Sequence, residues 1–217
     1  MTGVQTCALP ILIGADDPLG EAVVREALVR GLLVQATAVH PEQLPRLSPT
    51  LRVVRARPAV QHELVPAISG TDAVVLGLSP RLGSEPTMRV TDAAIATARA
   101  MRAAGVPRLM AASSLDLAGP SAAPNALRSL LAPVHDRLHH GGLQDLRRLE
   151  RLLAGSGLDW TVLRAGQLVD LLGTREQRVV PVETGASRTL AREDLARALV
   201  DQALRPGEEP RVLAVTA

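Results

Sequence analysis

A turn with spaced glycines follows the first apolar run and carries the clearest chemical signal in the chain. The segment reads Ile11-Leu12-Ile13-Gly14-Ala15-Asp16-Asp17-Pro18-Leu19-Gly20. Glycines at the first, fourth and seventh positions of such a turn let backbone N–H groups at a helix N-terminus face a pyrophosphate. Gly14 and Gly20 keep the outer positions, and Asp17 occupies the middle one. The turn therefore predicts a dinucleotide site with a carboxylate at its centre.

Asp17 has two interpretations. Asp17-Pro18 is a favourable helix start, because proline suits the first helical position and the Asp17 side chain can accept from the N–H of Leu19 or Gly20. The carboxylate would then cap the helix and replace the phosphate. In the other interpretation, Gly14, Ala15 and the residues from Asp17 to Gly20 still bind cofactor with a shifted phosphate. A carboxylate about 4 Å from a phosphate charge costs on the order of 4 kcal/mol at an effective dielectric near 20.

Three further positions follow predicted strands and are candidate contacts. His40 ends the strand predicted over 33–39, where an acid would select NAD and an arginine would accommodate NADP. His40 is neither an acid nor an arginine, and it could equally well be a solvated residue before Pro41. Leu78 and Ser79 end the strand predicted over 73–78 and should border a bound nucleotide. Ser113 ends the strand over 108–112, where its hydroxyl could polarise a substrate carbonyl or simply form a turn.

His135, His139 and His140 form the only histidine cluster. Two of them share a helix face, but Gly141-Gly142 should break the helix and no second ligand group is recognisable. We therefore expect a solvated helix end and no metal site. Further along, Glu150 should pair with a neighbouring arginine on its own helix.

Alternating strands and helices predict the architecture that positions these residues. The expected fold is α/β, a Rossmann-like, doubly wound parallel sheet in a single three-layer domain. Helices are expected over 21–30, 59–68, 87–104, 144–153 and 191–204. Strands are expected over 9–13, 33–39, 51–55, 73–78, 108–112, within 155–166, and over 178–182 and 211–216. Residues 116–133, rich in Pro, Ala, Ser and Gly, are expected to form a loop.

The amino-acid composition limits the classes of partner that we expect the protein to bind. All 24 basic residues of the 217-residue chain are arginine, Phe and Tyr are absent, and Trp160 is the single aromatic residue. The net charge is only +2, and the pI of 9.8 reflects the scarcity of groups that titrate above neutrality. Charges are interspersed, so we expect no nucleic-acid partner. No apolar run reaches membrane-spanning length, so we expect no membrane partner and a cytoplasmic location.

The first eleven residues differ from the rest. Met1-Thr2-Gly3-Val4-Gln5-Thr6-Cys7-Ala8-Leu9-Pro10-Ile11 resembles the in-frame translation of a common short-read sequencing adapter. We interpret residues 1–11 as a non-native assembly scar and residues 12–217 as an NAD(P)-binding Rossmann domain. Cys7 then carries no redox information, and the first strand has lost its native outer half. Adapter sequence in the underlying DNA would test this.

Several motifs in order carry a family resemblance. They are Gly14-Ala15 with Gly20, Ser113-Ser114 after a strand, the segment Ser156-Gly-Leu-Asp-Trp-Thr-Val-Leu-Arg164, and Arg192-Glu-Asp-Leu-Ala196. Together they resemble the atypical short-chain dehydrogenase/reductases, the NmrA-like and NAD(P)H-binding group. The resemblance covers nearly the whole chain from Leu12. It implies a Rossmann fold binding NADP or NAD and a dinucleotide partner with a small-molecule acceptor; members are reductases, epimerases or redox sensors.

The chain departs from that family where catalysis would occur. Catalytic members carry a Tyr-x-x-x-Lys pair, and alignment from Glu150 puts Leu143 and Arg147 at those positions. The chain has neither Tyr nor Lys, so that general acid/base mechanism is excluded. Arg147 could still hold a ribose or phosphate. We expect either a flavin- or quinone-type reductase or sensor, or a non-catalytic interaction protein in which Asp17 fills the cofactor site.

Overall fold

The computed structural model describes residues 10–44, 48–80, 83, 87–118, 126–184, 186–205 and 210–217, excepting the side chains of 43, 118 and 126–139. Its helices are α1 (Pro18–Val29), α2 (Gln61–Ile68), α3 (Arg89–Ala104), α4 (Ala126–Ala154) and α5 (Arg192–Leu204). Its strands are β1 (Pro10–Ile13), β2 (Val34–Ala38), β3 (Leu51–Arg55), β4 (Ala73–Leu76), β5 (Arg108–Ser114), β6 (Asp159–Ala165), β7 (Gln167–Val169), β8 (Arg178–Pro181), β9 (Thr189–Ala191) and β10 (Arg211–Thr216).

Eight strands form one sheet in the order β3-β2-β1-β4-β5-β6-β10-β8. Every neighbouring pair is parallel except β10 and β8. The strand order reverses between β1 and β4, where Ile13 pairs with Leu76. In such sheets, ligands bind outside the carboxyl ends of the strands at this reversal. The predicted doubly wound Rossmann-like sheet is confirmed, with an antiparallel strand at one edge.

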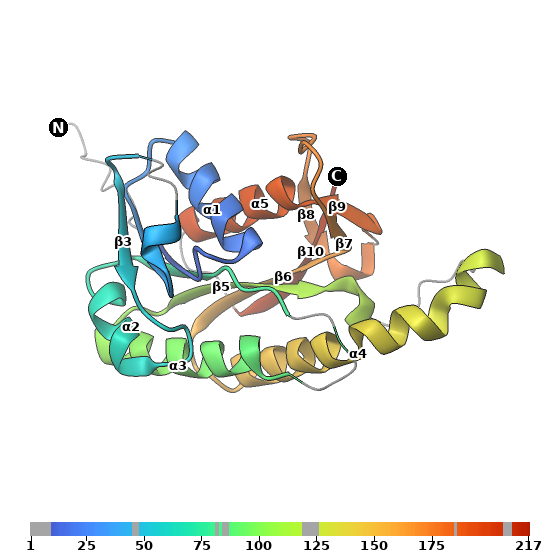
Figure 1. Cartoon of the computed structure of the whole chain (residues 1–217), viewed down its shortest axis with the longest axis horizontal. Helices are drawn as coiled ribbons and strands as arrows, with labels where there is room; N and C mark the ends of the chain where they lie inside the picture. Colours follow the sequence, from blue (N-terminus) through green and yellow to red (C-terminus); the bar gives the residue numbers. More distant parts are fainter. Residues whose placement is uncertain are drawn as a thin grey trace.

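Two helical layers cover the sheet (Figure 1). α1 and α5 lie together on one face, and α2, α3 and α4 lie on the other. Successive strand residues point to opposite faces, so Ile11 and Ile13 join the core under α2 to α4, while Leu12 joins the core under α1 and α5. Both cores are almost entirely aliphatic, and Trp160 of β6 lies in the first of them, only 8% exposed. The predicted three-layer domain is confirmed.

β1 includes the last two residues of the segment that we interpret as foreign. Pro10 pairs with Ala73, and Ile11 pairs with both Gln35 and Val74. Ile11 is fully buried. The central strand therefore depends on these two residues whatever their origin, and residues 1–9 lie outside the described part of the chain.

The prediction for the segment before β6 was wrong from Ala126 onward. Residues 116–133 were expected to form a loop and Gly141-Gly142 to break a helix, but α4 runs unbroken from Ala126 through both glycines. Residues 119–125 of the expected loop lie outside the described part of the chain. Both glycines are buried, and the N–H of Gly141 donates to the carbonyl of Gly83 at 3.2 Å. A glycine costs a helix only about 1 kcal/mol relative to alanine, which tertiary packing can offset. β7 and β9, which pair in a second sheet, were not predicted.

No helix in the described part of the chain is both long enough and apolar enough to cross a membrane.

Candidate functional site

The turn after β1 has the backbone shape that its glycines predict. Gly14 adopts a φ of +91°, and its N–H donates to the carbonyl of Thr37 in β2 at 3.2 Å. A side chain at Gly14 would be strained at this φ and would collide with Leu78. Ala15 is buried and also donates to Thr37, at 2.8 Å. Gly14, Ala15 and Leu78 thus lie together at the carboxyl edge of the sheet.

Gly20 allows α1 to approach the sheet closely. A Cβ at Gly20 would collide with the carbonyl oxygen of Gly14 and lie 3.1 Å from that of Gly77. A Cβ at Gly77 would in turn lie 2.8 Å from the Cα of Gly20. The close packing that the last glycine of this motif provides is therefore retained. Gly77 is its counterpart on the β4 side, which the sequence did not single out.

Asp17 fills the helix N-terminus where a pyrophosphate would lie. It has extended backbone geometry at the N-cap of α1, with Pro18 at the first helical position, and its side chain accepts from the N–H of Leu19 at 3.1 Å. The carboxylate also accepts from the Ser79 hydroxyl at 2.9 Å and the Ser79 N–H at 3.2 Å, and forms an ion pair with Arg89 at 2.8 Å. Asp17 is only 4% exposed. The predicted N-cap is confirmed. Of the two N–H groups that could donate to Asp17, that of Leu19 does so.

Arg89 makes a second contact beside Asp17. It begins α3, and its Nη1 also donates to the carbonyl of Ser79 at 2.6 Å. The N-terminus of α3 is capped from α4, because the buried Asp145 carboxylate accepts from the N–H groups of Val90 at 2.9 Å and Thr91 at 3.0 Å. Two helix N-termini near the site are thus each satisfied by a carboxylate of the chain.

These contacts decide how far a dinucleotide fits. The turn keeps the backbone frame, and four donors converge at one point: the N–H of Leu19, the N–H and hydroxyl of Ser79, and the Arg89 guanidinium. Such a donor set suits one anionic group. We call it the anion seat. In this fold the seat holds Asp17, so the frame fits a dinucleotide only when the carboxylate has moved out.

The tip of β2 carries charged groups of both signs. His40 is exposed, and its Nδ1 lies 3.5 Å from a Glu42 oxygen. Arg55 binds the other Glu42 oxygen at 2.7 Å. A backbone hydrogen bond to Glu42, with Arg55 and His40 adding to it, holds the pKa of that carboxyl below its usual value. Asp16, which the sequence did not single out, accepts from the N–H of Val39 at 3.0 Å.

The far end of the candidate site lies at the ends of β5 and β6. Ser113 is 7% exposed, and its hydroxyl has no hydrogen-bond partner among the described residues. It pairs in register with Arg164, whose guanidinium binds Glu150 of α4 at 2.6 and 3.0 Å. Hydrogen bonding to Glu150 raises the pKa of Arg164. The expectation that Glu150 pairs within its own helix was wrong, because β6 presents Arg164 directly to α4.

The remaining candidates are not brought into this group. Arg147 is exposed on α4, and Leu143 on the preceding turn is half-buried. His140 is exposed and lies 2.6 Å from the Gln144 amide nitrogen. The side chains of His135 and His139 lie outside the described residues. Among the residues that are described, no cluster of three metal-binding side chains occurs.

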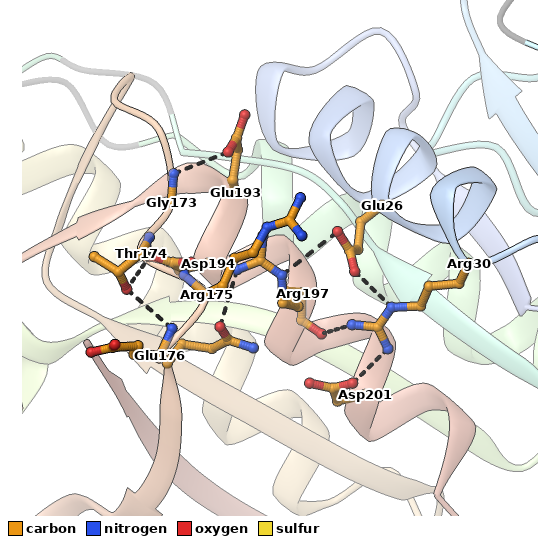
Figure 2. Close-up of polar contacts among 11 residues, drawn as sticks. Glu26, Arg30, Gly173, Thr174, Arg175, Glu176, Glu193, Asp194, Arg197 and Asp201 are labelled. Carbon is orange, nitrogen blue, oxygen red and sulfur yellow. Dashed lines mark hydrogen bonds and ion pairs between the residues drawn. The ribbon is translucent and has the colours of Figure 1, made fainter.

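The Arg192–Ala196 motif has a structural role on the α1 and α5 face (Figure 2). Asp194 is fully buried and accepts from the N–H of Thr174 at 3.0 Å and that of Arg175 at 3.3 Å. Arg197 binds Asp194 at 2.6 Å and reaches Glu26 of α1 at 3.7 Å. This cluster therefore ties the helix after the glycine turn to the loop that follows β7.

Comparison with known proteins agrees with this architecture. The profile of the family described as NAD(P)H-binding matches residues 14–206. No curated protein matches the sequence.

Among solved structures, a short-chain dehydrogenase/reductase from Veillonella parvula in complex with NADP is similar at a TM-score of 0.75 and 16% identity, over 96% of this chain and 94% of that one. An anaerobilin reductase from Escherichia coli O157:H7 gives 0.75 and 17%, over 96% of each chain. An oxidoreductase from Lactococcus lactis gives 0.72 and 16%, over 96% and 90%. The family match covers most of the chain, so the chain belongs to the NAD(P)H-binding family, and it has a Rossmann-like fold.

Proposed function

We propose that the protein is a redox sensor that binds a nicotinamide dinucleotide at the carboxyl edge of its sheet. The cofactor enters only by displacing Asp17 from the anion seat. The observation that carries this proposal is the buried Asp17 carboxylate on donors that suit a phosphate. Because the chain supplies a competing anion, the affinity is low, and occupancy follows the cellular concentration of the dinucleotide.

The polar groups of the seat have defined roles once Asp17 has moved. Arg89 and the Ser79 hydroxyl and N–H would hold the pyrophosphate, together with the N–H of Leu19. Gly14 and Gly20 keep side chains out of the approach. These are the residues that we assign to the cofactor.

The residues at the ends of β5 and β6, where a hydride acceptor would bind, favour a sensor over a dehydrogenase. A bound reduced nicotinamide supplies hydride transfer. The chain has no Tyr or Lys to move a proton, and Arg164 near Ser113 is committed to Glu150. Ser113 could orient a carbonyl but has no base beside it among the described residues. A flavin or quinone acceptor would need only orientation, so a reductase of that kind is the active alternative.

The same carboxylate favours a second candidate, a non-catalytic interaction protein whose seat is permanently filled. Asp17 makes four polar contacts at 4% exposure, and a buried carboxylate that loses its partners is costly. If that cost exceeds what a pyrophosphate gains at the seat, no dinucleotide binds.

Thermal unfolding separates these functions. We expect millimolar NADH or NADPH to raise the Tm of the unchanged protein slightly, since any ligand of the native state stabilises it by mass action. Asp17→Gly restores the glycine and should lower the Kd at least about tenfold. Asp17→Asn should give a smaller gain. Asp92→Asn, which removes an exposed charge from the first turn of α3, is the matched control and should change nothing.

Two outcomes would contradict the proposal. If the unchanged protein responds to neither dinucleotide, the proposal fails, and a response by Asp17→Gly alone supports the interaction protein whose seat Asp17 fills. If the protein binds NADH and oxidises it when flavin or quinone is added, measured as loss of reduced-nicotinamide absorbance, it is a reductase and not a sensor.

A further inference from the structure

The turn places a second carboxylate, Asp16, at the carboxyl tip of β2. Asp16 is exposed, and one of its oxygens accepts from the N–H of Val39 at 3.0 Å, so this carboxylate sits at the carboxyl tip of β2. In Rossmann folds, an acid at that tip hydrogen-bonds the ribose hydroxyls of NAD, and an arginine there accommodates the 2′-phosphate of NADP. The acid usually belongs to β2 itself. Here the first glycine turn supplies it.

The positive charge at the same tip is already engaged. Arg55 donates to Glu42 at 2.7 Å and to the carbonyl of Val39 at 3.2 Å. His40 faces the other oxygen of Glu42. Among the described residues, two carboxylates, one guanidinium and one imidazole therefore lie at this tip, and the guanidinium is paired with one of the carboxylates. A phosphate dianion would meet Asp16, while the described arginine at this tip already binds Glu42.

We propose that Asp16 makes the site selective for NAD(H) over NADP(H). One carboxylate oxygen stays on the N–H of Val39 and the other accepts from a ribose hydroxyl, while a 2′-phosphate is repelled. Asp16 is the specificity-determining residue of the proposed site. This inference rests on the proposed binding of a dinucleotide.

Calorimetric titration with NADH and with NADPH tests it in two backgrounds, the unchanged chain and Asp17→Gly. We expect NADH to bind at least about tenfold more tightly than NADPH in both. Asp16→Ser removes the charge and should bring the two affinities to within about threefold, chiefly by improving NADPH. Asp16→Asn should do the same while keeping an oxygen for the Val39 N–H. Asp92→Asn, which removes an exposed charge from α3, should leave the preference unchanged.

The failures are distinguishable. Equal binding of NADH and NADPH by the unchanged chain, or a preference that survives in Asp16→Asn, overturns the role of Asp16 and leaves the proposed function standing. If neither nucleotide binds even Asp17→Gly, the proposed function fails and the role of Asp16 with it. Higher ionic strength should reduce the preference, because the repulsion acts between exposed charges.

Discussion

At the scale of single residues, the Asp17–Arg89 pair combines a buried anion with a half-exposed cation. Asp17 is 4% exposed and Arg89 is 35% exposed in their side chains. A buried carboxylate is stable only when it is paired and hydrogen-bonded. The contact with Arg89 thus stabilises the folded protein and also keeps the Asp17 carboxylate in the anion seat.

Replacing Arg89 with Met should lower the free energy of unfolding by about 2 kcal/mol, because Asp17 keeps three hydrogen bonds but loses its counter-ion. Urea unfolding measures the loss. The double variant with Asp17→Asn should recover at least about 1 kcal/mol, since the amide needs no counter-ion. Arg25→Met breaks the exposed pair with Glu21 and should cost under about 0.5 kcal/mol. Additive losses in the double variant would show that the two residues are not coupled.

An exposed pair gives a pH prediction. The Arg57 guanidinium, with a hydrogen bond from the Arg57 N–H, lowers the pKa of Glu63 from 4.5 to about 2. A lowered acid pKa stabilises the fold above the unfolded value and loses that stabilisation as the pH falls through the folded value. Glu63→Gln should therefore be less stable than the parent at neutral pH, and the difference should vanish between pH 4.5 and about 2. A difference that persists at the acid end would contradict the shift.

Local rules predicted the residues whose roles are local. Asp17 as a cap and Gly14 as a turn residue follow from the types and positions of neighbouring residues. Arg89 and Asp145 could not be found this way, because each acts on an element far along the chain. Asp16 was not predicted as a cofactor contact, because the acid that selects the cofactor is expected directly after β2 in the sequence. Asp16 belongs to the turn after β1 and reaches the tip of β2 only in the folded protein.

At the scale of elements, α4 is the helix whose extent the sequence pattern did not predict. A run of small residues, Pro133 and the pair Gly141-Gly142 all indicate a loop, yet the helix continues. Gly141 is buried and its N–H donates to the carbonyl of Gly83, so this glycine takes part in tertiary contacts and does not end the helix. Propensity is a weak prior that tertiary contacts override.

Asp145 links α4 to α3 and offers the test at this scale. It is fully buried and accepts from two backbone N–H groups and from the Thr91 hydroxyl. Asp145→Ala should cost about 2 to 4 kcal/mol in urea unfolding, as a cap and several hydrogen bonds are lost. Hydrogen exchange at Val90 and Thr91 should accelerate. Asp145→Asn keeps the volume and one acceptor, so it should lose less. Unchanged exchange at Val90 would contradict the cap.

At the scale of the whole molecule, the alternation of strands and helices sufficed to predict the layers and the sheet. The antiparallel edge did not follow from it. β8 has the residues of any short strand and pairs antiparallel with β10. The loop before it is held by Asp194, which lies far along the chain, and no local pattern indicates such a contact. β1, in contrast, was predicted from its apolar residues alone. Ile11 is fully buried, and an apolar side chain of suitable size fills the core there whatever the origin of the segment.

The nearly aromatic-free core gives the protein a built-in optical probe. Trp160 is the single tryptophan, lies on β6 beside Leu109 of β5, and is 8% exposed. Its fluorescence therefore reports one place in one core, without competing emitters. Reduced nicotinamides absorb where a buried tryptophan emits, so a dinucleotide bound at the strand ends would quench this emission by energy transfer. Oxidised forms would not, and the difference between the two signals would read the redox state of the bound cofactor without any label.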